Sequence, residues 1–241
     1  MAPSGPSPTF TTLFRSPHLT YRPLTSSTTD KSFLYRVLST EPNTWAQSTN
    51  RLLQPLTQED IDKHVDGLAG SLLAVIICLP PAVVINRKAL AKKGKEVETS
   101  GKDGENRQDK DTPIGWLTLS LHPLSAHHRS ATLGIIISEP YQRKGYGTES
   151  ITWAIEWAFS VASMHSIRLT CFSFNDGALR LYRRMGFKEE GRNREAYRYA
   201  GRWWDRVLFS VLEDEWGVLK VRKELMRGEE WGGGGERARV D

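Results

Sequence analysis

The stretch YQRKGYGTES, from Tyr141 to Ser150, sets two glycines and a basic pair between an isoleucine run and an amphipathic pattern. A strand that ends in a glycine-bearing turn and opens a helix presents backbone N–H groups at the positive end of the helix dipole, which makes an anion site. Gly145 and Gly147 let the backbone approach a phosphate closely, and Arg143 and Lys144 add positive charge at the rim. The turn therefore predicts a cradle for a pyrophosphate, although alone it would also suit an ordinary strand-to-helix connection.

The spacing of the glycines narrows the choice of phosphate ligand. A dinucleotide site uses G-x-G-x-x-G, but here Gly145 and Gly147 are followed by Thr148, Glu149 and Ser150, so the third glycine is missing. The P-loop pattern G-x-x-x-x-G-K-[ST] does not occur in this chain. What remains is Q-x-x-G-x-G, from Gln142 to Gly147, directly after a strand-like run.

The elements that must position this turn follow from hydrophobic periodicity and capping residues. The expected order is β-α-α-β-β-β-α-β-α-β-β, a mixed α/β domain covering residues 17–217. The expected strands are Leu19–Thr25, Ser71–Leu79, Pro113–Leu121, Ser130–Ser138, Ser166–Phe174 and two strands of a hairpin around Ala200-Gly201; the expected helices are Ser26–Leu38, Thr57–Leu68, one with an apolar face from Ile151 to Ala162, and one from an Asn175 cap to a Gly186 cap.

Composition predicts which parts of the chain lie outside this domain. Residues 1–16 are rich in Pro, Ser and Thr and are expected to be disordered, and residues 88–112 are expected to form a charged, flexible insertion. Residues 218–241 are expected to form a helix fragment and a flexible tail. The N-terminal stretch is poor in acidic residues and has some features of an organellar targeting segment. The longest apolar run, Leu72 to Ile85, is broken by two prolines and is too short to span a bilayer, so we expect a cytoplasmic protein without membrane contact.

Two further features bear on the class of chemistry. Cys78 and Cys171 both lie in apolar, strand-like runs without a histidine at ligand spacing, so we expect buried thiols and neither a metal site nor a thiol nucleophile. The basic excess of the chain, 33 Lys and Arg against 28 Asp and Glu, is concentrated between Arg129 and Arg206. That bias suits a phosphate-bearing ligand, but also a nucleic acid or solubility alone.

Three segments in the right order and spacing resemble a known family: LGIIISEPYQRKGYGTES, NDGALRLYRRMGFKEEG and GRWWDRVLFSVLEDEW. The chain resembles the GNAT superfamily of acyl-CoA-dependent N-acetyltransferases, and within it the RimJ/RimL-like (acetyltransferase type 3) branch, which also contains spermidine acetyltransferases. The resemblance spans Leu19 to Trp216. It implies a central mixed, mostly antiparallel, twisted sheet flanked by helices, with acetyl-CoA as the acyl donor.

The resemblance also implies a role for individual residues. The backbone of Ile135, Ile136 and Ile137 would bind the pantetheine arm, Asn175 would face that arm, and the Tyr182 hydroxyl would lie near the thioester sulfur as the catalytic group. The pyrophosphate would be held by the turn, whose implied cofactor-binding residues are Gln142, Arg143, Lys144, Gly145, Tyr146, Gly147 and Thr148.

The implied reaction is direct attack of an amine on the thioester, without a covalent enzyme intermediate. An alkyl amine has a pKa of about 10, so its proton must be removed first. Glu139, Glu149, His127, His128 and Asp205 are acid/base types that could border the site, but the sequence does not choose among them. The acceptor could be a polyamine, another small amine or a protein N-terminus.

Two other classes of function stay open beside the enzyme. One is a non-catalytic CoA-binding or scaffolding domain that keeps the fold, although such a domain would not need both the glycine turn and Tyr182. The other is a nucleic-acid binder, which ranks last because no known aromatic-basic binding motif occurs. A homodimer is compatible with the resemblance but has no sequence signal of its own.

Overall fold

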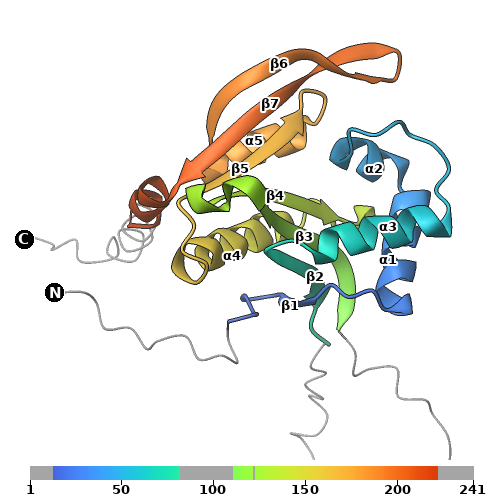
Figure 1. Cartoon of the computed structure of the whole chain (residues 1–241), viewed down its shortest axis with the longest axis horizontal. Helices are drawn as coiled ribbons and strands as arrows, with labels where there is room; N and C mark the ends of the chain where they lie inside the picture. Colours follow the sequence, from blue (N-terminus) through green and yellow to red (C-terminus); the bar gives the residue numbers. More distant parts are fainter. Residues whose placement is uncertain (1–12, 82–110, 122, 222–241) are drawn as a thin grey trace, which may run out of the picture.

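The computed structural model describes residues 13–81, 111–121 and 123–221, which build one seven-stranded sheet with helices on both faces (Figure 1). The strand order is β1-β2-β3-β4-β5-β7-β6, and every neighbouring pair is antiparallel except β4 and β5. The strands are β1 Thr20–Pro23, β2 Leu73–Leu79, β3 Thr112–Leu121, β4 Ser130–Ile137, β5 Ser166–Phe172, β6 Lys188–Tyr199 and β7 Arg202–Leu212. The expected mixed, mostly antiparallel sheet is confirmed.

Helices cover the two faces of the sheet and create two hydrophobic cores. The helices are α1 Thr28–Thr40, α2 Pro42–Ser48, α3 Gln58–Ala69, α4 Tyr146–Ser160 and α5 Asp176–Met185, with short 3-10 turns at Pro123–His128 and Glu139–Tyr141. The larger core packs α4 and α5 on one face, and the smaller core packs α1, α2 and α3 on the other. Side chains of β4 alternate between the two, since Leu133 joins the first core and Ile136 the second.

Local sequence signals explain most helix boundaries. Thr57 and Asp60 form a reciprocal capping box at the start of α3. Asn175 caps α5 by accepting from the Ala178 N–H, and Gly186 ends the helix in the left-handed conformation with φ 99°. The apolar face expected between Ile151 and Ala162 is the buried face of α4, which begins earlier, at Tyr146.

The structure differs from the expected order by one helix. α2 (Pro42–Ser48) was not predicted, because its seven residues are too few to show a helical period. Its proline at the first turn was the available signal, since that position has no intrahelical N–H bond to lose. The helix matters for function because it packs on β4 and β5.

The ends of the domain also differ from the expected boundaries. Leu13 and Ser16 belong to the packed structure, since the Leu13 carbonyl accepts from Trp153 Nε1 and the Ser16 hydroxyl donates to Glu149, so the expected disordered segment 1–16 extends too far. Residues 1–12, and the charged insertion apart from Asp111 and Thr112, lie outside the described residues. Residues 213–221 are helical, so regular structure continues past Gly217 into the segment expected to hold a helix fragment and a flexible tail, most of which is not described.

The parallel pair β4 and β5 separates partway along its length. The two strands are in register only from Ser130 opposite Ser166 to Thr132 opposite Arg168, although β4 continues to Ile137 and β5 to Phe172. Beyond that point the backbone edge of β4 has no partner strand. The resulting gap at the carboxyl ends of both strands is where the cavities described below meet.

Candidate active site

The turn between β4 and α4 leaves a continuous run of backbone donors unbonded. Within the described part of the chain, none of the amides of residues 143–148 donates to a protein acceptor. The first amide bonded inside the helix is that of Glu149, which donates to the Gly145 carbonyl at 3.0 Å. Gly145 is the N-cap and makes no side-chain cap bond, so the helix dipole is not neutralised by a capping group.

The two glycines of the turn are required for different reasons. Gly145 has φ 89°, in the left-handed region where a side chain is strained. Gly147 lies inside the first turn of α4 with no such backbone demand, and a Cβ added there would meet no protein atom within 4 Å. Since neither backbone nor packing explains Gly147, the space beside it is available to a ligand.

A groove of about 900 Å³ runs from this turn to the gap between β4 and β5. One wall is the turn itself, with Arg143, Gly145 and Thr148, and the opposite wall is the start of α5. Arg180 and Arg184 of α5 add two further cations to the groove. Basic side chains facing a row of amides are suited to a diphosphate.

The exposed edge of β4 offers backbone groups at alternate residues. The Ser138 N–H donates to the Ile114 carbonyl of β3 at 2.8 Å, and the Ile136 carbonyl lies against Gly115 of the same strand. Because backbone groups of a strand alternate between its two edges, Ile135 and Ile137 face the gap. All three isoleucines were expected to bind a donor through their backbone. The backbone groups of Ile136 point toward β3, so only those of Ile135 and Ile137 face the gap.

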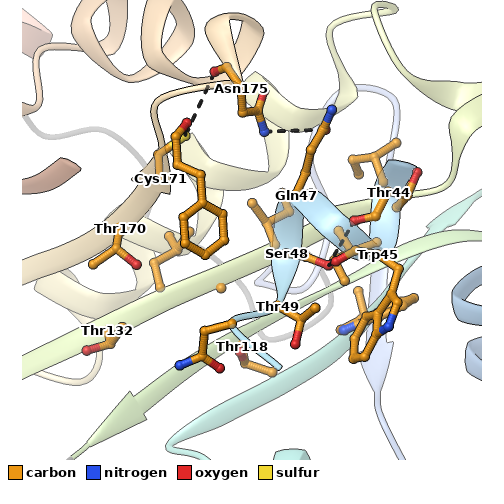
Figure 2. A pocket seen from close by; sticks show the side chains of 18 of the residues that line it. Thr44, Trp45, Gln47, Ser48, Thr49, Thr118, Thr132, Thr170, Cys171 and Asn175 are labelled. Atoms are coloured by element: carbon orange, nitrogen blue, oxygen red, sulfur yellow. Dashed lines mark hydrogen bonds between the residues drawn. The ribbon is translucent and has the colours of Figure 1, made fainter. Parts of the chain in front are cut away.

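Two predicted cofactor-binding side chains are engaged with the protein. The Gln142 side chain donates from Nε2 to the Ile137 carbonyl at 2.9 Å and to Thr44 Oγ1 at 3.2 Å, so it ties the turn to both β4 and α2. Asn175 donates from Nδ2 to Gln47 Oε1 of α2 at 3.3 Å while it caps α5. Figure 2 shows the Asn175 and Gln47 side chains reaching toward each other from the two sides of the gap.

Tyr182 lies where two cavities meet. It lines both the large groove and a second cavity on the α2 side of the sheet, yet only 9% of the residue is exposed. Its ring packs edge-on against Phe187 at 5.8 Å, and the hydroxyl bonds to no described residue. Burial, with a smaller effect of Cys171, raises the pKa of Tyr182, so the hydroxyl keeps its proton and can donate it.

The second cavity, of about 340 Å³, is called the acceptor cavity below. Its walls come from α2, from the β3 and β4 face below it, and from β5 and β7. Hydroxyl groups are frequent in its lining, which includes Thr44, Ser48, Thr49, Thr118, Thr132 and Thr170 (Figure 2).

Glu41 holds α2 over this cavity. The carboxylate, 6% exposed in the folded chain, accepts the Ser138 hydroxyl at 2.5 Å and the Glu139 N–H at 2.7 Å. These bonds join the α1–α2 junction to the end of β4, directly before the glycine turn. Glu41 is a positioning residue because it lines neither cavity.

None of the five general-base candidates from the sequence lines either the groove or the acceptor cavity. His127 and His128 lie before the start of β4, at the end opposite the gap. Glu149 accepts from Ser16 and His18; although burial opposes it, these bonds lower the pKa of the carboxyl.

Glu139 is exposed beside the turn, and Asp205 accepts the Glu195 N–H on the β6–β7 hairpin.

The structure places a different titratable group, His64 of α3, in the acceptor cavity. Burial, with a smaller effect of the nearby Arg51 charge, lowers the pKa of His64 from its usual 6.5, so the imidazole is neutral at neutral pH. It packs edge-on against Trp45 of α2, with ring centroids 6.1 Å apart. His64 had no signal in the sequence, because its place in the cavity depends on how α3 packs on α1 and β2.

The cysteines are buried and unpaired, as expected. Burial raises the pKa of Cys171 to about 12 and that of Cys78 to about 11, so both stay as unreactive thiols. Among the described residues, no group of His, Cys, Asp and Glu side chains could hold a metal ion. None of the helices in those same residues is long and apolar enough to cross a membrane.

A row of unbonded amides beside two separating strands, with a tyrosine between two cavities, is an arrangement that suits binding of an acyl-CoA. Comparison with known proteins agrees, because residues 102–187 match the model of the acetyltransferase (GNAT) family. This match agrees with the resemblance described under the sequence analysis.

Individual relatives show the same resemblance. The spermidine N(1)-acetyltransferase of Vibrio cholerae is 34% identical over 89 residues, which cover 37% of this chain and 51% of that protein. An uncharacterised N-acetyltransferase of Bacillus subtilis, YnaD, is 30% identical over 84 residues, which cover 35% of this chain and 49% of that protein. The chain thus spans about half the length of these curated relatives.

A solved structure extends the similarity to nearly the whole fold. The crystal structure of the Vibrio cholerae spermidine N-acetyltransferase in complex with CoA and spermine superposes with a TM-score of 0.61. The superposition covers 83% of this chain and 99% of that chain. Because the sequence identity is only 20%, it supports the fold and not the activity.

Proposed function

We propose that this chain is an N-acetyltransferase that moves the acetyl group of acetyl-CoA to a primary amine by direct attack. The observation that carries the proposal is the row of unbonded amides at residues 143–148, which opens into a groove that ends at Tyr182. A non-catalytic CoA-binding domain would need the row of amides but not the buried tyrosine. The relatives named for spermidine support a small amine as acceptor.

The donor is bound by main-chain groups and arginines. The amides of residues 143–148 hold the diphosphate, with Arg143, Arg180 and Arg184 around it. The backbone of Ile135 and Ile137 binds the pantetheine arm as an added strand would, because this edge of β4 has lost its partner. The Gln142 and Asn175 side chains keep the turn, α5 and α2 in place around the groove.

The chemistry needs two proton transfers and one place for negative charge. The amine nitrogen forms a bond to the acetyl carbon, the carbon–sulfur bond breaks, and the sulfur takes a proton. Tyr182 supplies that proton, and a β4 N–H facing the gap stabilises the carbonyl oxygen as charge develops on it.

We assign to His64 the removal of the proton from the acceptor amine. Within the described lining of the acceptor cavity, it is the one group that titrates near neutral pH, and it is neutral there. It therefore accepts the amine proton, directly or through water. The rate at saturating acceptor should fall as the pH drops through the lowered pKa of His64, and His64→Asn should remove this acid limb. An unchanged pH profile in the variant would exclude His64.

The assignment to the RimJ/RimL-like branch, a peptide N-terminus as acceptor and a homodimer stay predictions from the resemblance. The two unpaired cysteines suit a reducing compartment, which supports the expected cytoplasmic location.

The direct test combines binding with turnover. Acetyl-CoA should raise the melting temperature of the full chain, and CoA thiol release should depend on an added amine. The control is acetyl-pantetheine, which has the thioester and the pantetheine arm but lacks the diphosphate. It should stabilise the chain much less. Absence of both stabilisation and amine-dependent thiol release would contradict the proposal.

A further inference from the structure

The acceptor cavity contains positive charge without compensating carboxylates. Its described lining includes Arg51 and Arg206 but neither an aspartate nor a glutamate. His64 adds no charge at neutral pH, because its pKa is lowered. A polyamine, which carries several positive charges, would therefore meet cations on the protein and no anion among these residues.

Arg206 is the more informative of the two arginines. It lies on β7 opposite Phe172, the last residue of β5, in the part of β5 that no longer pairs with β4. Its Nε is buried and has no hydrogen-bond partner, and its guanidinium forms no ion pair with any described residue. A buried donor of a charged group is costly when it is left unpaired, so native structures satisfy such groups with a partner.

The neighbouring arginines show what pairing looks like in this part of the chain. Arg192 on β6 contacts Glu189 at 2.7 Å and Asp205 at 3.6 Å, and Arg183 contacts Glu189 at 2.9 Å. Both arginines are partly exposed, yet they have protein partners. Arg206 is less exposed to solvent than Arg202 of the same strand, and it lines the acceptor cavity, so a ligand in that cavity can supply its partner.

One carboxylate close to Arg51 is already engaged by the protein. Asp60 lines a separate cavity of about 120 Å³ that shares Arg51 and His64 with the acceptor cavity. Its carboxylate accepts both the N–H and the hydroxyl of Thr57 in the α3 capping box. These bonds lower the pKa of Asp60 and keep it at the helix terminus.

We propose that the acceptor amine of this enzyme also carries a carboxylate, as an amino acid does, and that this carboxylate pairs with Arg206. The inference rests on the proposed function and adds the class of acceptor to it. A guanidinium matches a carboxylate through two parallel hydrogen bonds, which no ammonium group could replace. The cavity of about 340 Å³ has the size of a small-molecule site, and its threonines supply neutral partners for the rest of the molecule.

The first experiment needs no mutation. Thiol release by the wild-type chain is measured for free amino acids, for the same amino acids with the carboxylate replaced by a carboxamide, for spermidine and for an aminoalkyl phosphate. The free amino acids should have roughly ten- to hundredfold higher kcat/KM than their amides, the range expected for hydrogen bonds to a charged partner. Spermidine or the amides reacting as well as the amino acids would overturn the proposal, and so would preference for the phosphate.

The second experiment assigns the selectivity to Arg206. Arg206→Gln should raise KM for the amino acid by roughly ten- to hundredfold, with little change for the matched amide. Arg202→Gln, on the same strand but outside both cavities, is the matched control and should change neither. An equal loss for acid and amide would show a structural role for Arg206 and would overturn the proposal.

The two levels of inference fail in different ways. Normal acetyl-CoA binding together with acetylation of spermidine would refute the carboxylate-bearing acceptor and leave the acetyltransferase intact. No acetyl-CoA binding and no acetylation of any amine would refute the proposed function itself.

Discussion

Gly147→Ala should make the protein more stable and at the same time weaken its binding of CoA. Gly147 is the second residue of α4, its φ is not positive, and a Cβ there meets no protein atom within 4 Å. Alanine is therefore accommodated by the fold, whereas the same methyl group occupies space beside the amides that face the groove. Gly145 is the weaker choice, because its φ of 89° would add strain to any effect on binding.

The substitution should stabilise the fold and weaken CoA binding, and the size of each effect follows from a different interaction. Alanine is better than glycine in a helix interior by about 1 kcal/mol, and about half of that is expected in the first turn. For a domain of this size, the gain corresponds to a rise of about 1–2 °C in melting temperature. Loss of one hydrogen bond to a charged phosphate weakens binding by about 1.5–3 kcal/mol, which is a roughly ten- to hundredfold increase in Kd.

The assay is calorimetric titration of CoA together with thermal unfolding of the ligand-free chain. Gly67→Ala in α3 is the matched control, because Gly67 is also a helical glycine with open space around its Cβ position. It should raise the melting temperature and leave the Kd unchanged. Undiminished CoA affinity in Gly147→Ala would refute the reasoning that this glycine is kept for a ligand.

Three further outcomes follow from the site and its support. Tyr182→Phe should lower turnover by roughly 10²- to 10⁴-fold, the range of general acid catalysis, with unchanged acetyl-CoA affinity, and equal turnover would remove it from the mechanism. Glu41→Gln should raise the acceptor KM and destabilise the chain by about 1–3 kcal/mol, whereas Glu59→Gln, in an exposed pair, should do neither. Asp30→Asn should cost about 2–3 kcal/mol, less than the 3–5 kcal/mol of a fully buried pair because its partner Arg22 is partly exposed. Although burial alone would raise the pKa of Asp30, hydrogen bonds lower it from 3.8, so the wild-type advantage over Asp30→Asn in urea unfolding should hold at neutral pH and vanish as the pH falls through the lowered value.

The glycine turn and the caps of α5 could be placed from the sequence because their signals are local. The turn from Gln142 to Thr148 is contiguous in sequence, and its glycines carry the chemistry of a helix N-terminus directly. The caps Asn175 and Gly186 are also local, since each bonds within one or two turns of α5. Such features need no knowledge of the tertiary fold.

The acceptor side could not be predicted because it depends on contacts between distant segments. Arg206 enters the cavity only through the pairing of β7 with β5, which sets it opposite Phe172. His64 enters through the packing of α3 near the unpredicted α2. The backbone of Ile136 faces away from the groove because of the register between β3 and β4, in which Gly115 lies opposite Ile137. Sequence periodicity gives the alternation of a strand but not which edge faces a gap.

Amide chemical shifts test the central claim most directly, because the claim concerns main-chain N–H groups. In ¹H–¹⁵N spectra of the full chain, CoA should shift the amides of residues 143–148, and these shifts should be among the largest observed. Pantetheine, which lacks the diphosphate, should affect residues near Ile135 and Ile137 but leave the turn unchanged. Saturation with CoA without a change at residues 143–148 would contradict the account.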